Sequence, residues 1–185
     1  MKKIISVLFA LCLCMAASAQ QHMKFMGIPL DGTVDNFALK LKAKGVTYDA
    51  AKSKAAGLGG RVFSGKFMGE NATISVLYNP KSKIVFSAAV EMQYPTVESA
   101  RIPFLNLTES LQQKYPNTTP EENKGPDGEF IGMAFNILDE TGNNSIGFIL
   151  QSLKTSSFGS GVSICLMYTD RASVEKCGAI FSEEL

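Results

Sequence analysis

The sequence predicts an α+β fold made of two units in tandem, each a helix followed by three antiparallel strands, with the helices on one face of the sheet. Apolar residues recur at helical spacing ahead of each set of strands, and they alternate with polar residues within the strands. The links between strands are too short for parallel crossovers. We therefore expect a single domain over residues 20–185, with repeats at about 25–95 and 96–170 and a C-terminal tail.

The first helix is marked at both ends. Thr33 is a natural N-cap, and Gly45 is the type of residue that usually follows a helix. Between them, apolar residues fall on one side of a helix: Val34, Phe37, Ala38 and Leu41. Residues 46–60 are rich in alanine, lysine and glycine, which predicts a loop with one helical turn over residues 50–56.

Three strands follow, over residues 61–68, 71–78 and 84–92, with turns at residues 69–70 and 79–82. In the third strand, a two-residue period places Ile84, Phe86, Ala88, Val90 and Met92 on the core side. A second helix lies between Pro95 and Pro116. Because Pro103 lies within it, either the regular helix begins at this proline or the helix is kinked there.

The second unit ends in three more strands. Residues 117–129 predict a flexible connector, and the strands are expected around residues 131–137, 146–150 and 162–168. A loop rich in serine and glycine is predicted over residues 154–161, and one short helix in the tail from Arg171.

The first nineteen residues have the pattern of a secretory signal peptide. Lys2 and Lys3 precede an apolar run over residues 4–15, and small residues then lead to a predicted cleavage between Ala19 and Gln20. The apolar run is shorter than the roughly twenty residues that span a bilayer. We therefore expect a periplasmic or secreted protein that is not inserted in the membrane after cleavage.

Removal of the leader changes the charge and the cysteine content. The remaining chain has 16 basic and 17 acidic residues, and it has no basic cluster of the kind that nucleic-acid binding requires. Cys165 and Cys177 are the two cysteines left. In an oxidising compartment such a pair predicts a disulfide, and the alternative is two free thiols.

The residues needed for most catalytic sites are missing. The single histidine, His22, lies near the start of the mature chain, where disorder is the usual expectation. Ser–His and Cys–His nucleophile pairs and a four-ligand zinc site are therefore not expected. Glu91 is the best single candidate for a carboxylate-based hydrolase, but spacing identifies no partner for it. We expect no enzyme, no cofactor and no metal.

Several motifs carry a family resemblance. Residues 25–33 (FMGIPLDGT), residues 65–69 (GKFMG) and the helix end at residues 114–116 (KYP) resemble a group of uncharacterised secreted proteins of Bacteroidota. The order of helix and strands resembles the β-lactamase-inhibitory-protein-like fold. This second resemblance implies protein binding without catalysis, but it identifies no binding residue.

Strand alternation also predicts which residues lie on the sheet face opposite the core. The set is almost free of charge, with only Lys66 and Glu91 charged: Ser64, Lys66, Thr73, Ser75, Leu77, Val85, Ser87, Ala89, Glu91, Gly132, Ala134, Asn136, Gly147, Ile149, Gln151, Ser163, Cys165, Met167 and Thr169. Small neutral residues allow another surface to approach closely. Either the chain's own loops and tail cover this face, pinned by a Cys165–Cys177 bridge, or a partner docks there.

Three functions follow from these observations. The leading hypothesis is an exported, non-catalytic module that binds a protein or peptide, or a second copy of itself in a homodimer, through the open sheet face. The residues expected at the centre of that face are Thr73, Ser75, Ser87, Ala89, Ser163 and Met167. The alternative is a carrier of a small apolar ligand with a pocket between helices and sheet. A hydrolase built on Glu91 is the remote third.

Overall fold

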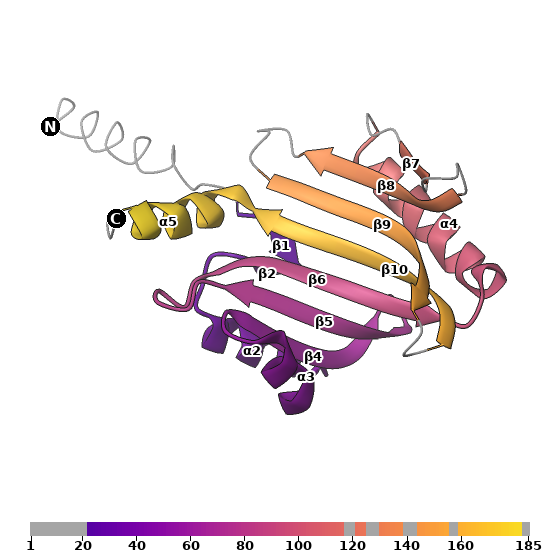
Figure 1. Cartoon of the computed structure of the whole chain (residues 1–185). Helices are drawn as coiled ribbons and strands as arrows, with labels where there is room; N and C mark the ends of the chain where they lie inside the picture. The colour runs from indigo at the N-terminus through magenta and orange to yellow at the C-terminus, as the bar shows by residue number, and fades with distance from the viewer. Residues whose placement is uncertain (1–21, 117–120, 125–129, 139–143, 156–158, 183–185) are drawn as a thin grey trace, which may run out of the picture.

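The protein forms one large antiparallel sheet with helices at its faces and ends (Figure 1). The computed structural model describes residues 22–116, 121–124, 130–138, 144–155 and 159–182. In spatial order the eight strands are β3 (Thr47–Tyr48), β4 (Gly60–Phe67), β5 (Glu70–Tyr78), β6 (Val85–Tyr94), β10 (Gly159–Asp170), β9 (Asn144–Thr155), β8 (Phe130–Leu138) and β7 (Glu121–Lys124). The predicted leader and its cleavage site lie outside the described residues.

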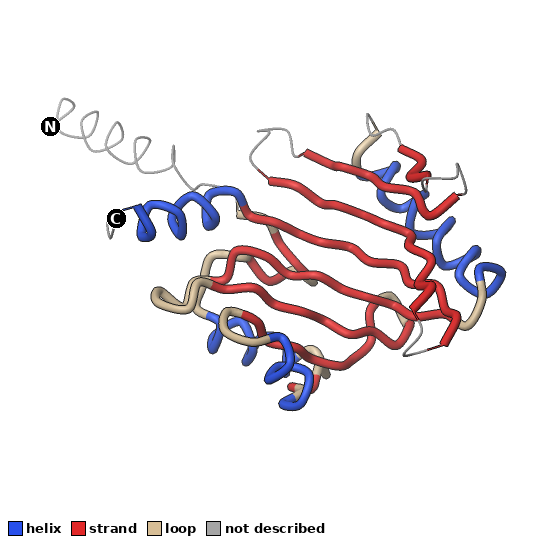
Figure 2. Tube along the Cα trace, viewed as in Figure 1, coloured by secondary structure: helices blue, strands red, loops and turns tan. Residues whose placement is uncertain are grey.

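Four helices and a small hairpin complete the described fold (Figure 2). The helices are α2 (Val34–Ala43), α3 (Ala50–Ala56), α4 (Val97–Lys114) and α5 (Arg171–Ser182). The hairpin pairs β1 (Lys24–Phe25) with β2 (Ile28–Pro29). The α+β class is thus confirmed, whereas the equivalence of the two tandem units stays a prediction.

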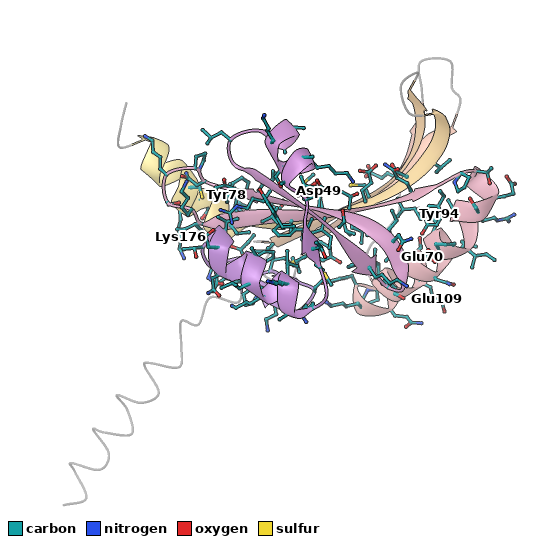
Figure 3. The ribbon with its side chains drawn as sticks, turned by 90° about the horizontal axis from the view of Figure 1, so that it is seen from below. Asp49, Glu70, Tyr78, Tyr94, Glu109 and Lys176 are labelled. Carbon is teal, nitrogen blue, oxygen red and sulfur yellow. The ribbon has the colours of Figure 1, made fainter. Side chains whose placement is uncertain are left out.

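The main core lies between the sheet and the helices α2 and α4. Val34, Phe37 and Leu41 of α2 are buried, as their helical spacing predicted. They join one buried cluster with residues of β5, β6, β10 and α4: Ile74, Val76, Ala88, Val90, Ile164, Leu166, Phe104 and Leu107. In the view of Figure 3, α2 and α4 lie on the lower side of the sheet. Helix α3, with Asp49 at its start, lies on the upper side.

Helix boundaries follow the capping signals in the sequence. The Thr33 hydroxyl accepts the Asn36 N–H at 3.5 Å at the start of α2. At the start of α4, Thr96 and Ser99 form a reciprocal capping box. Because α4 begins at Val97 and continues past Pro103, the alternative in which the helix begins at that proline is wrong.

Two identical tetrapeptides, Lys-Phe-Met-Gly, form the tight turns at β1–β2 and β4–β5. In both, the methionine and glycine have positive φ: 50° and 75° at Met26 and Gly27, 52° and 88° at Met68 and Gly69. Two successive positive φ angles are the requirement of a type I′ hairpin turn. The second turn therefore lies one residue before the predicted position. The preceding phenylalanines, Phe25 and Phe67, stack with ring centroids 6.1 Å apart.

Several local predictions need correction. The pairing of β5 with β6 shifts by one residue, which leaves Phe86 without a partner on β5. Because of this extra residue, Val85 points into the core, although strict alternation placed it on the outer face. The predicted connector contains the strand β7, and the rest of residues 117–129 lies outside the described residues. Part of the loop predicted over residues 154–161 is strand, because β9 ends at Thr155 and β10 begins at Gly159, and the residues between them lie outside the described part.

Tyr168 provides a pH test of the core. Burial, with a smaller contribution from Tyr115, raises the pKa of Tyr168 from 10.0 to about 12. The folded state therefore holds this proton more tightly than the unfolded state, so its contribution to stability is complete below pH 10 and is lost as the pH rises toward 12. We expect the free energy of unfolding to fall by about 2 kcal/mol over this range. Urea denaturation between pH 10 and 12 should show a smaller fall in the free energy of unfolding for Tyr168→Phe than for the wild type. Identical pH profiles for the two proteins would contradict the raised pKa of Tyr168.

Candidate functional site

The sheet face opposite the core, called the outer face here, is made of rows that cross β5, β6 and β10. Strand register aligns Thr73 with Glu91 and Cys165. The next row in the same direction is Ser75, Ala89 and Met167, followed by Leu77, Ser87 and Thr169. The six residues predicted at the centre of a partner face therefore lie on one face of three neighbouring strands. The side chains of the β8 and β9 residues predicted on this face lie outside the described part.

Exposure divides the six residues into two groups. Met167 is 45% exposed, and Thr73, Ser75 and Ala89 are half-buried. Ser87 and Ser163 are only 2% and 3% exposed, so their place in a docking surface has to be corrected. Ser87 donates its hydroxyl proton to the Tyr168 carbonyl at 2.9 Å, which joins β6 to β10. Leu77, 40% exposed, supplies a second accessible apolar side chain on this face.

Helix α3 covers one margin of the outer face. The Val62 N–H donates to the Ser53 hydroxyl oxygen at 2.8 Å, and Val62 is 5% exposed. The Lys52 ammonium donates to the Thr73 hydroxyl at 3.2 Å. Helix α3 thus covers β4, which agrees with the alternative that the chain covers part of this face itself. Met167 on β10 is nevertheless 45% exposed, and Ala89 on β6 is half-buried.

The C-terminal tail packs at the end of the sheet instead of crossing the outer face. Cys177 of α5 is buried, and its thiol lies beside Asn79 and Ser82 in the turn between β5 and β6. Cys165 lies four residues before Thr169 on β10, paired with Glu91. Both cysteines are free in this structure, so no bridge pins the tail here, and the disulfide stays a prediction.

His22 is held in place, contrary to the expectation of disorder. Its Nδ1 lies 3.1 Å from both carboxylate oxygens of Asp170, and Asp170 is fully buried. The carboxylate also accepts the backbone N–H groups of Met23 at 2.7 Å and Ser173 at 2.8 Å. The nearby Ser173 hydroxyl donates to the Leu30 carbonyl at 2.7 Å, so it is not oriented as a nucleophile toward His22.

An open groove of about 820 Å³ crosses one end of the outer face. Polar residues line most of it: Lys44, Thr47, Ser64, Lys66, Asn71, Thr73, Glu91 and Gln93. Glu91 accepts a hydrogen bond from the Gln93 amide at 3.3 Å. Among the described residues that line this groove, no second carboxylate faces Glu91, so the two-carboxylate arrangement of a glycosidase is not formed here.

Cys165 lies beside Glu91 in the same row of the sheet. Burial raises the pKa of the Cys165 thiol, and the negative charge of Glu91 raises it further. The thiol therefore stays protonated at neutral pH, which makes it a poor nucleophile and a poor metal ligand. The described residues also contain no cluster of three histidine, cysteine, aspartate or glutamate side chains that could hold a metal ion.

The reactivity of Cys165 gives a direct test of this geometry. Replacing Glu91 with glutamine removes the neighbouring negative charge, so the pKa of Cys165 should fall and its alkylation by iodoacetamide at pH 8 should become about threefold faster. Peptide mass mapping reports the rate at Cys165 separately from the other cysteines. Glu98→Gln, an exposed change on α4, is the matched control. Equal rates in the two variants would contradict the contact between Cys165 and Glu91.

A second groove, of about 740 Å³, lies between α2 and the edge strands β3 and β4. It is lined by Asp35, Ala38, Leu39, Lys42, Val46, Thr47, Tyr48, Arg61 and Phe63. Its volume is in the range of small-molecule sites, roughly 300–1,000 Å³. A sealed helix–sheet interface would have removed the ligand-carrier alternative, and this groove retains it.

Comparisons with known proteins identify no relative of this chain. No family model, no curated protein and no solved structure matches this chain. The resemblances to secreted Bacteroidota proteins and to the β-lactamase-inhibitory-protein-like fold therefore stay predictions. No helix in the described part of the chain is long and apolar enough to cross a membrane.

Proposed function

We propose that this chain is an exported binding protein without catalytic activity, and that it holds a segment of another protein on the outer face of its sheet. The observation that carries the proposal is the row Ser75, Ala89 and Met167, with Leu77 beside it. Met167 and Leu77 are 45% and 40% exposed, and Ser75 and Ala89 beside them are small and uncharged. Apolar side chains grouped on a neutral surface are typical of the centre of a protein interface.

The same face indicates the chemistry of the bound segment. Ser75 and Ala89 are small enough for the backbone of a partner to approach the sheet closely. Met167 and Leu77 favour an apolar side chain from the partner. Glu91 is half-buried and accepts a hydrogen bond from Gln93, and it forms no ion pair within the described structure. A lysine or arginine of the partner next to that apolar side chain would supply the missing cation.

Site-specific crosslinking tests the proposal. A photo-crosslinking amino acid is placed at Met167, and at Gln112 on the exposed side of α4 as the control, and each protein is irradiated in an envelope extract of the source organism. We expect a discrete protein adduct at Met167 that is absent at Gln112. Adding Ala89→Lys to the Met167 protein should abolish that adduct, because the lysine puts a charge at the centre of the face.

Each result of this experiment has a meaning. An adduct of twice the chain mass identifies a second copy as the partner. Adducts that are equal at the two positions, or that persist with Ala89→Lys in a variant whose thermal unfolding is unchanged, would overturn docking on this face. Gln112→Lys, which changes the net charge equally, should leave the Met167 adduct intact.

A further inference from the structure

The groove between α2 and β4, called the α2–β4 groove here, has an apolar middle and charged ends. One side of α2 forms one wall, through residues at helical spacing: Asp35, Ala38, Leu39 and Lys42. Tyr48 of β3 and Phe63 of β4 form the opposite wall, where their rings meet edge to face at 5.6 Å. The groove is therefore a channel along α2, separate from the outer face and its proposed partner.

The middle of the groove exposes large apolar side chains to water. Leu39 is 68% exposed and Tyr48 is 53% exposed, and both line the same groove. Phe63 beneath them is 2% exposed. Exposed single apolar residues are common on protein surfaces, but two that line one concave channel over a buried ring are typical of a site for an apolar group.

The charges at the two ends of the groove are unequal. At one end Arg61 donates to the Asp35 carboxylate at 2.6 Å, and its guanidinium also lies 5.7 Å from the centre of the Tyr78 ring. This pair is neutral overall. At the other end Lys42 forms no ion pair within the described structure, and the groove has a net positive charge there.

Three lysines at the C-terminal end of α2 oppose the negative end of the helix dipole. A helix C-terminus carries a partial charge of about −0.5, which disfavours a bound anion. Lys40, Lys42 and Lys44 bring three full positive charges to the same end of the helix. The lysines outweigh the dipole, so the open end of the groove favours a negatively charged group.

We propose that the α2–β4 groove binds an anionic amphiphile with a single alkyl chain, such as a fatty acid. The chain lies against Leu39, Tyr48 and Phe63, and the carboxylate meets Lys42 at the open end. From Asp35 to Lys42 the helix advances about 10 Å, which matches an extended chain of roughly eight carbons. The Asp35–Arg61 pair closes the far end and limits the length of chain that fits.

Calorimetric titration of the full chain with four probes tests the class of ligand. Decanoate has both a ten-carbon chain and a negative charge. Decanol has the chain without the charge, and decyltrimethylammonium has the chain with a positive charge. Acetate has the negative charge without a long chain. Decanoate and decyltrimethylammonium are used below the concentrations at which they form micelles, and decanol is used below its solubility limit. We expect decanoate to bind about tenfold more tightly than decanol, and acetate not to bind at the same concentration.

Paired variants locate the site. Lys42→Glu should weaken decanoate binding about tenfold, whereas Lys40→Glu, the same charge change outside the groove, should have a much smaller effect. Leu39→Asp should abolish decanoate binding, whereas Ile102→Asp, at a residue of α4 that is 67% exposed, should not. All four residues are exposed, so the variants are expected to fold.

Several results would overturn the proposal. Equal affinity for decanoate and decanol would mean that no anion is recognised, and the groove would then be an apolar site for another occupant. Equal effects of Lys40→Glu and Lys42→Glu would mean only a long-range charge effect. Loss of decanoate binding in Ala89→Lys would place the ligand on the outer face. If decanoate binding survives in Ala89→Lys, this site is independent of the proposed protein interface.

Discussion

Replacing Asp170 with alanine is expected to lower the free energy of unfolding by about 4 kcal/mol. The Asp170 carboxylate is fully buried and accepts backbone N–H groups from Met23 and Ser173. The substitution leaves both N–H groups buried without a partner, and it removes the N-cap of α5 and the contact with His22. Hydrogen bonds to a charged group contribute about 1.5–3 kcal/mol each, part of which offsets the cost of burying the carboxylate.

Urea denaturation followed by circular dichroism measures this loss. Asp170→Asn is the informative companion, because asparagine has the same shape and keeps one acceptor oxygen for one of the two N–H groups. We expect its destabilisation to be about half that of alanine. An alanine variant within 1 kcal/mol of the wild type would show that the two ends of the domain are not held by this carboxylate.

Replacing Phe25 with alanine is expected to cost about 3–5 kcal/mol of unfolding free energy, although Phe25 lies in a strand of only two residues. Phe25 is fully buried. Its ring stacks on Phe67 at 6.1 Å and meets the ring of Tyr168 edge to face at 5.2 Å. Because these two rings come from β4 and β10, the N-terminal hairpin fills a cavity that the large sheet leaves open.

Two further variants distinguish the packing of the Phe25 ring from a general effect of mutating the hairpin. Lys24→Ala changes the exposed neighbour of Phe25 and should alter stability by less than about 0.5 kcal/mol. In a double-mutant cycle with Phe67→Ala, the coupling energy should be about 0.5–1.5 kcal/mol. Additive effects of the two phenylalanine substitutions would show that the stacked pair is not formed.

The parts of the fold that the sequence predicts correctly are those with local signals. Helix α2 has a capping threonine, an apolar stripe and a terminal glycine within twelve residues of one another, and the structure confirms all three features. The core faces of β5 and β6 follow a two-residue period, so Ile74, Val76, Ala88 and Val90 were placed correctly. In these segments local preference and tertiary packing agree.

The features that escaped prediction depend on distant contacts or on very short elements. Strands of two residues, such as β1–β3, are too short to show a period. A single extra residue at Phe86 reversed the side on which Val85 lies. His22 was expected to be disordered because its partner, Asp170, is 148 residues away in the sequence.

The candidate site was predictable in composition but not in shape. Strand alternation alone placed Ser75, Ala89 and Met167 on one face. It could not show that Ser87 and Ser163 are buried. Nor could it show that the short helix α3 packs on the outer side, or that α2 leaves a groove beside β4, because both follow from how edge elements pack.

The strand at the middle of the sheet, β10, is the last strand in chain order among the described residues. β10 pairs with β6 on one side and β9 on the other, so it alone joins the two halves of the described sheet. Until residues 159–170 are available, β6 presents an open edge of ten residues. The two halves of the described sheet therefore stay unpaired with each other until β10 has inserted between β6 and β9. The open edge of β6 is prone to pair with other chains until β10 inserts.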